Sequence, residues 1–133
     1  MTLPQRINYI TLGARDMASL RAFYAGVGWN ERPGSSDDFA TYEAGATLLA
    51  LYPIEQLGEE AAPGERLPEL GWNGFTLGIN VESPQAVDDT FQSAVAVGAH
   101  SVTEPVKREW GGYSGYFSDP EDNRWEITWA PEG

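Results

Sequence analysis

The chain has 133 residues, 41% of them hydrophobic, and no cysteine. This composition predicts one globular domain with its own core, and it excludes disulfides, thiolate nucleophiles and thiolate metal sites. The net charge of −12, from 20 acidic and 8 basic residues, argues against nucleic-acid binding, which depends on clustered lysine and arginine. The N-terminus has no apolar run typical of a signal peptide or membrane span, so we expect a cytoplasmic protein with no membrane partner.

The first half of the chain predicts a strand, a helix and three further strands. Residues 7–13 alternate between apolar and polar side chains, as strands do. Asp16 is suited to cap the helix that follows, and Gly28 is suited to end it. Three shorter strands are then predicted, at residues 29–32, 39–44 and 46–53.

The middle of the chain, residues 54–72, is rich in proline, glycine and glutamate. This composition predicts a connecting segment with one short helical turn near residues 54–57. Such a segment either joins the two halves or lies over a ligand site.

The second half repeats the order of the first. Residues 75–81 predict a strand, Ser83 and Pro84 predict a helix start, and Gly98 predicts the helix end. Strands follow at residues 101–106, 111–117 and 124–129. The last two are joined by SDPEDN, which predicts a tight turn, because it lacks the alternating oxygen ligands and distal glutamate of a calcium loop.

The two halves, with the segments LGARDMASLRAFYAGVGW and GGYSGYFSDPEDNRWEITW, resemble the vicinal oxygen chelate superfamily. That group includes glyoxalase I, extradiol dioxygenases, fosfomycin-resistance enzymes and bleomycin-resistance proteins. The resemblance implies an α+β fold of two βαβββ modules, at about residues 5–53 and 73–131 of one domain, whose mixed sheets curl into an open cup. It also implies that modules pair within one chain or between chains, and we expect a homodimer.

Enzymes of this superfamily bind a divalent metal in the cup, through His, Glu or Gln side chains on the first and last strands of each module. The corresponding places in this chain fall on Tyr9, Leu49, Thr76 and Glu126. One carboxylate, two hydroxyl groups and a leucine do not match the ligand sets of catalytic zinc, magnesium or manganese. We therefore expect no metal and no other cofactor. The single histidine, His100, follows the second helix, where we expect a surface residue.

The last predicted strand, RWEITW, separates its side chains into two faces. Alternation places Trp125, Ile127 and Trp129 on one face, and Glu126 and Thr128 on the other, toward the cup. Together with the places that the resemblance assigns to the cup and the aromatic residues near them, this alternation predicts a ligand site made of Tyr9, Thr11, Leu49, Thr76, Trp110, Tyr116, Glu126 and Thr128.

The aromatic residues of the second half suggest what the cup binds. Trp72, Trp110 and Tyr116 lie near Glu126 in the predicted module, while alternation turns Tyr113 to the opposite face from Tyr116. An aromatic pocket with one carboxylate suits a flat or cationic organic ligand. The same aromatic side chains would equally fill a core or a dimer interface.

Three roles fit Glu126: a structural ion-pair partner of Arg6, Arg15 or Arg124, a ligand-binding carboxylate, or a catalytic general base. The ligand reading predicts a metal-independent small-molecule binding protein of the bleomycin-resistance kind, which is the function we favour. The alternative is a glyoxalase-like lyase or isomerase that uses Glu126 as a base or metal ligand. A third reading is a structural or regulatory domain without a ligand.

Overall fold

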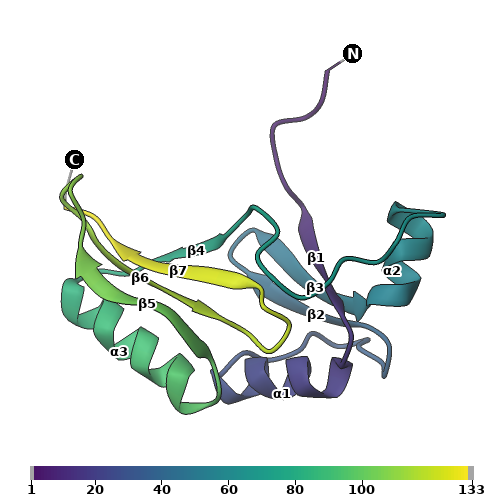
Figure 1. Cartoon of the computed structure of the whole chain (residues 1–133), viewed down its shortest axis with the longest axis horizontal. Helices are drawn as coiled ribbons and strands as arrows, with labels where there is room; N and C mark the ends of the chain where they lie inside the picture. Colours follow the sequence, from purple (N-terminus) through teal and green to yellow (C-terminus); the bar gives the residue numbers. More distant parts are fainter. Residues whose placement is uncertain (1, 132–133) are drawn as a thin grey trace. The chain divides into compact units, whose positions relative to one another are not determined.

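A computed structural model describes residues 2–131 of the chain, which divide into two compact units between Pro68 and Glu69. Within these residues, the first unit combines two helices, and the second unit one helix, with one open, mixed β-sheet (Figure 1). The α+β class and the mixed sheets predicted from the sequence are therefore confirmed. Within residues 2–131, no helix has both the length and the hydrophobicity needed to cross a bilayer.

The first unit contains β1 (Tyr9–Ala14), α1 (Met17–Gly26), β2 (Ala40–Ala44), β3 (Thr47–Pro53) and α2 (Ile54–Ala61). Its sheet has the order β1-β3-β2, in which β1 runs parallel to β3 and β2 runs antiparallel to it. The predicted strand at residues 29–32 is not formed. Arg32 still contacts this sheet: its amide donates to the Thr41 carbonyl oxygen at 2.8 Å, and its Nε lies 3.9 Å from Glu43 Oε1.

Helix α1 begins and ends as its sequence predicts. The Asp16 carboxylate accepts a hydrogen bond from the backbone amide of Ser19 at 3.1 Å, and Gly28 follows the helix with a φ of +94°. Leu20, Phe23 and Tyr24 form the buried face of the helix, so α1 covers one face of the first sheet.

Helix α2 extends over two turns, where one turn was predicted. It packs on β1 at Gly13, where an added Cβ would lie 3.0 Å from Ile54 Cγ1 and 3.3 Å from Leu57 Cδ2. The absence of a side chain at Gly13 therefore lets the helix approach the strand closely.

The second unit contains β4 (Leu77–Asn80), α3 (Pro84–Ala96), β5 (His100–Lys107), β6 (Tyr113–Ser118) and β7 (Arg124–Trp129). Its sheet has the order β4-β7-β6-β5, with β4 parallel to β7 and the other pairs antiparallel. In both units the first strand in the sequence pairs in parallel with the last strand in the sequence, β1 with β3 and β4 with β7. A helix follows the first strand in each case. This pairing is shared by the two units, although, in the described part of the chain, two strands follow the first helix of the first unit, where three were predicted, and three follow the helix of the second unit.

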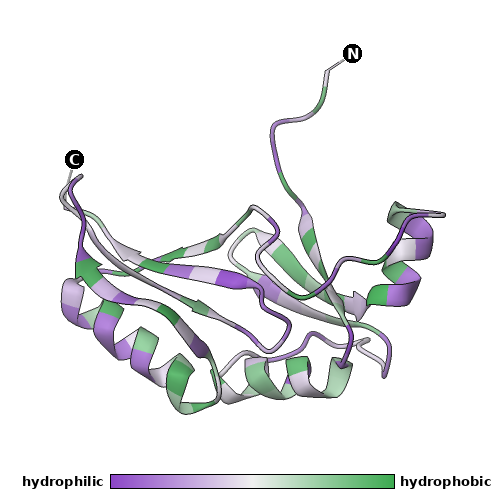
Figure 2. Ribbon diagram, in the orientation of Figure 1, coloured by the Kyte–Doolittle hydropathy of each residue, from purple (hydrophilic) through white to green (hydrophobic). Residues whose placement is uncertain are grey.

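Helix α3 starts at Ser83, whose hydroxyl accepts a hydrogen bond from the amide of Ala86 at 3.0 Å. Hydrophobic and hydrophilic residues alternate along it (Figure 2), as expected for a helix with one buried face. Phe91 on that face contacts Phe117 of β6 edge-to-face, with ring centroids 6.3 Å apart, and Phe117 stacks on Trp125 of β7. The core of the second unit therefore lies between α3 and one face of the sheet.

Candidate functional site

The two faces of the second sheet carry different side chains. Trp125 and Ile127 of β7 are buried on the face that packs on α3. Tyr113 of β6 belongs to this face, since its hydroxyl donates to Asp88 of α3 at 2.7 Å. The alternation predicted for residues 124–129, and the opposite directions predicted for Tyr113 and Tyr116, are confirmed.

The other face, which we call the Glu126 face, consists of two adjacent rows of paired residues. Glu126 pairs with Gly78 on one side and with Tyr116 on the other. The next row holds Thr128, flanked by Asn80 and Ser114. No helix of its own unit covers this face, and Glu126, Tyr116 and Thr128 are half-buried.

Gly78 leaves open space next to the Glu126 carboxylate. A Cβ built at Gly78 would meet no atom within 4 Å beyond its own chain neighbours. Because Gly78 and Glu126 are register partners in a parallel pair, this space lies on the face to which Glu126 points. Gly78 is exposed on the edge strand β4, so this space is open to solvent beside the paired Glu126.

Arg108 contributes a positive charge to the same face. Its Nε donates to Ser114 Oγ at 2.9 Å, and its Nη2 donates to the Ser114 carbonyl oxygen at 3.0 Å. The guanidinium carbon lies 5.7 Å from the centroid of the Tyr116 ring, within the range of a cation–π contact. Tyr116 is thus placed between a fixed guanidinium and the Glu126 carboxylate.

The surroundings of Tyr116 determine its protonation state. Burial raises the pKa of Tyr116 most, followed by the negative charge of Glu126 and a hydrogen bond to that carboxylate, while Arg108 lowers it in part. The net shift is upward, so the hydroxyl keeps its proton at neutral pH and donates to Glu126.

Glu126 has no ion-pair partner among residues 2–131. Arg124, one of the partners considered from the sequence, instead pairs with Asp122, at 2.9 Å between Nε and Oδ1. Arg15, a second, donates to the carbonyl oxygen of Pro68 in the first unit. The carboxylate therefore keeps acceptor capacity toward the open space at Gly78.

The prediction that Leu49 is the first-unit counterpart of Glu126 was wrong. Leu49 pairs with Ile10 and Tyr42, and it is buried on the face that packs on α1. Tyr9 and Thr11 lie on the opposite face, with Leu48 and Ala50 as their register partners. Since Thr11 and Gly78 stand five residues before the capping residues Asp16 and Ser83, the counterpart of Glu126 is Ala50. A register error of one residue reverses the face.

Of the remaining predicted residues, Thr76 and Trp110 lie outside the regular strands of the second unit, and Tyr9 belongs to β1 of the first unit. Thr76 precedes β4 and is exposed, and Tyr9 is 66% exposed in the first unit. Trp110 lies in the connection between β5 and β6, where its indole ring folds over Gly112 and remains 58% exposed. His100 begins β5 with an exposed side chain, and β6 separates it from β7.

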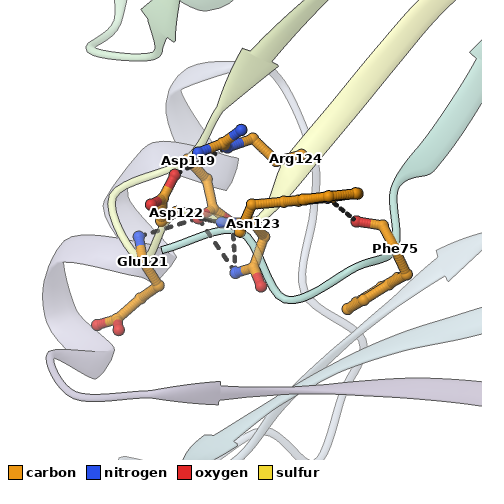
Figure 3. A network of polar contacts seen from close by, with 7 residues as sticks. Phe75, Asp119, Glu121, Asp122, Asn123 and Arg124 are labelled. Atoms are coloured by element: carbon orange, nitrogen blue, oxygen red, sulfur yellow. Dashed lines mark hydrogen bonds and ion pairs between the residues drawn. The ribbon is translucent and has the colours of Figure 1, made fainter. Parts of the chain in front are cut away.

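In the acidic turn between β6 and β7, the Asp119 carboxylate accepts hydrogen bonds from residues of the same turn (Figure 3). Asp119 Oδ1 accepts hydrogen bonds from the backbone amides of Glu121 and Asn123, at 2.9 and 3.0 Å. Both carboxylate oxygens also accept from the Asn123 side chain. Asp122 adopts a positive φ of 65°, and its carboxylate pairs with Arg124. These contacts make the turn a structural feature, in agreement with the prediction of a tight turn.

Carboxylates and imidazoles do not gather anywhere in the described part of the chain. Within residues 2–131, no three His, Asp or Glu side chains lie close enough together to hold a metal ion. The four places that the resemblance assigns to metal ligands hold, after correction of the first-unit register, Tyr9, Ala50, Thr76 and Glu126. This donor set does not fit a divalent metal, because it offers a single carboxylate and no imidazole.

Solved structures share this fold over nearly their full length. A glyoxalase-related enzyme from Fulvimarina pelagi matches with a TM-score of 0.86 and 25% identity, covering 98% of this chain and 94% of the other. A glyoxalase/bleomycin resistance protein/dioxygenase family enzyme from Burkholderia phytofirmans PsJN matches with a TM-score of 0.78 and 26% identity, covering 93% and 98%. Lactoylglutathione lyase from Agrobacterium tumefaciens matches with a TM-score of 0.71 and 21% identity, covering 96% of each chain, which shows the fold alone.

The sequence itself also identifies the family. No curated protein matches the chain significantly. The model of the Glyoxalase/Bleomycin resistance protein/Dioxygenase superfamily, however, matches residues 6–127, which is nearly the whole chain. The repeated units, the parallel pairing of first and last strands and this match agree, and the chain belongs to the glyoxalase/bleomycin resistance protein/dioxygenase superfamily.

Proposed function

We propose that this protein binds a small organic ligand on the Glu126 face of its second sheet, without a metal ion. The observation that carries the proposal is the open space at Gly78 beside the Glu126 carboxylate. A carboxylate with free acceptor capacity, an adjacent tyrosine and room for a ligand are the usual parts of a small-molecule site.

The polar groups of the Glu126 face indicate how a ligand would be held. Glu126 accepts a hydrogen bond or a positive charge from the ligand, and the Tyr116 hydroxyl orients the carboxylate. Asn80 and Thr128 in the neighbouring row add amide and hydroxyl groups. The ligand thus carries a donor or cationic group, which binds against Glu126, and an uncharged part that covers Gly78.

The metal-independent part of the proposal rests on donor chemistry. Glu126 is the single carboxylate at the four places that the family uses for metal ligands, and the counterpart in the first unit is the methyl group of Ala50. A divalent ion held by one carboxylate and neutral hydroxyls would keep most of its water ligands and bind weakly.

A glyoxalase-like lyase or isomerase is the second candidate function. It is favoured by the 25% identity to the Fulvimarina pelagi enzyme, whose description is glyoxalase-related. In this case Glu126 would remove a proton from a substrate lying over Gly78, with Tyr116 positioning the carboxylate. Turnover that disappears in Glu126→Gln while ligand binding persists would favour this candidate over binding alone.

The test combines ligand binding with a single substitution. A panel of small organic cations, neutral aromatic compounds and metal-free bleomycin is titrated into the protein in the presence of EDTA, with binding followed by NMR shifts of the backbone amides. We expect at least one compound to shift the amides around Gly78 and Glu126. Glu126→Gln should then weaken the binding of that compound by about 1.5–3 kcal/mol, the scale of a hydrogen bond to a charged group.

Controls separate this role from a structural one. Glu104→Gln changes an exposed carboxylate on β5 of the same unit and should leave affinity unchanged. A structural role for Glu126 predicts the opposite pattern, a lower melting temperature in Glu126→Gln with affinity retained. That result, or the absence of any compound that shifts these amides, overturns the proposal.

A further inference from the structure

The first unit contains a cleft between its sheet and α2, made entirely of first-unit residues. Its volume is about 430 Å³, within the usual range of sites for small molecules. The lining residues come from four segments: Thr11 of β1, Phe39 before β2, Tyr52 of β3, and Leu57 and Glu60 of α2.

Helix α2 forms one side of this cleft and packs directly on β1. Gly13 lets α2 contact β1 directly through Ile54, which is 8% exposed, and Leu57. Leu57 therefore touches the strand at Gly13 and also lines the cleft. The apolar floor of the cleft is thus part of the packing between α2 and the sheet.

Two aromatic rings form perpendicular walls of the cleft. The rings of Phe39 and Tyr52 contact each other edge-to-face, with centroids 6.1 Å apart and planes at 86°. Phe39 is 40% exposed, so its ring remains accessible to a ligand. Aromatic ring faces carry partial negative charge and attract cations.

The charges around the cleft are negative. The Tyr52 hydroxyl donates to Glu60 Oε2 at 2.9 Å, which holds that carboxylate at the edge of the cleft. The pKa of Tyr52 is raised, first by this hydrogen bond, then by burial, and then by the negative charges of Glu60, Asp38 and Glu59. No lining residue is basic. A positive charge in the cleft would be attracted by the Glu60 carboxylate and by the negative charges of Asp38 and Glu59 near Tyr52.

We propose that this cleft binds an organic monocation, such as a quaternary or protonated amine attached to an apolar group. The charged group would lie between the ring of Phe39 and the Glu60 carboxylate, and the apolar group would lie on Leu57. Cations attached to apolar groups are favoured over metal ions here, because the cleft offers aromatic faces and one fixed carboxylate instead of a set of oxygen ligands. The inference does not depend on the function proposed for Glu126.

The probe is benzyltrimethylammonium, compared with benzyl alcohol and benzoate, titrated into the full chain by NMR. We expect benzyltrimethylammonium to shift the amides of Thr11, Phe39 and Leu57, and to bind at least about fivefold more tightly than benzyl alcohol. Benzoate should not bind. Affinity for the cation should also fall as salt is added, because carboxylates at an open cleft are screened.

Substitutions locate the site within the chain. Glu60→Gln and Phe39→Leu should each weaken benzyltrimethylammonium binding by about fivefold. Glu55→Gln on the same helix removes an exposed charge that does not line the cleft, and it should change the affinity less than twofold, since its charge is solvent-screened. If Glu55→Gln lowers the affinity for benzyltrimethylammonium as much as Glu60→Gln does, the cation is attracted by the overall negative charge of the protein. That result would overturn the proposal.

Glu126→Gln distinguishes this proposal from the one made for the second unit. It should leave benzyltrimethylammonium binding unchanged. If Glu126→Gln weakens the binding of this cation and Glu60→Gln does not, the cation occupies the Glu126 face and the cleft proposal fails. If benzyltrimethylammonium binds no more tightly than benzyl alcohol, the cleft proposal fails while the Glu126 proposal stays open.

Discussion

Gly78 of β4 lies beside Glu126 of β7 as its register partner, and the space that a side chain at Gly78 would occupy is empty. This relationship distinguishes the Glu126 face from the opposite face of the same sheet, where Trp125 and Ile127 are packed under α3. Glycine in a strand usually weakens it, since it adds no side-chain packing and loses more backbone entropy on folding. At Gly78 this loss of packing and backbone entropy coincides with open space beside Glu126.

Replacing Gly78 with valine should fill this space. Valine favours strands and its Cβ meets no neighbour, so the free energy of unfolding should stay constant or rise by up to about 1 kcal/mol. A ligand that lies over Gly78 should lose affinity by roughly tenfold, about 1.4 kcal/mol. Urea unfolding and ligand titration on the same preparation check both parts. Unchanged affinity in Gly78→Val would show that the ligand does not use this space.

Chelation should have no effect on the protein. Since the family's ligand positions hold Tyr9, Ala50, Thr76 and Glu126, we expect EDTA to leave the melting temperature and ligand binding unchanged. A resident metal at 100 times its Kd would contribute about 2.7 kcal/mol of stability, an effect that a melting curve readily detects. A drop with EDTA that one divalent ion reverses would contradict the prediction.

Tyr42 makes the stability of the first unit depend on alkaline pH. Its hydroxyl is buried and has no hydrogen-bond partner within the described residues. Burial, followed by the negative charge of Glu31, raises the pKa of Tyr42 to about 12, while Arg21 lowers it in part. Between about pH 10 and pH 12 the Tyr42 hydroxyl therefore keeps its proton in the folded state, while the unfolded chain loses it. This contribution to stability is complete below about pH 10 and is lost as the pH rises through about 12.

Tyr42→Phe should consequently raise the free energy of unfolding at pH 7 by about 1 kcal/mol, because it removes a buried polar group without a partner. The substitution should also reduce the loss of the free energy of unfolding that occurs as the pH rises above about 10. Denaturant unfolding between pH 7 and pH 11 measures both effects. A lower stability at pH 7 would indicate that the hydroxyl is hydrogen-bonded in solution.

Asp119 should be important for stability and unimportant for binding. Asp119→Ala removes the acceptor for two backbone amides and for the Asn123 side chain, and we expect the free energy of unfolding to fall by about 2 kcal/mol. Glu104→Ala, an exposed carboxylate on β5, is the control and should change it by less than about 0.5 kcal/mol. Calcium should not restore the stability of Asp119→Ala, and restoration would contradict the assignment of a purely structural turn.

The repeated order of elements and the two helix starts were readable from local patterns. Asp16 and Ser83 cap their helices through contacts to residues three positions away, and such contacts depend on local sequence alone. Alternation in residues 124–129 predicted the direction of Glu126 for the same reason, since polar and apolar side chains differ clearly there. The α+β fold follows from these local signals taken together.

Leu49 shows where local patterns fail. Residues 48–51 are all apolar, so alternation gives no signal, and only the pairing of β3 with β1 and β2 determines which face each side chain takes. Helix α2 depends in the same way on a distant contact, at Gly13. Arg108 was not predicted because its contacts with Ser114 and Tyr116 exist only once β5 and β6 pair. Side chains far apart in sequence come together through strand register, which is a property of the tertiary structure.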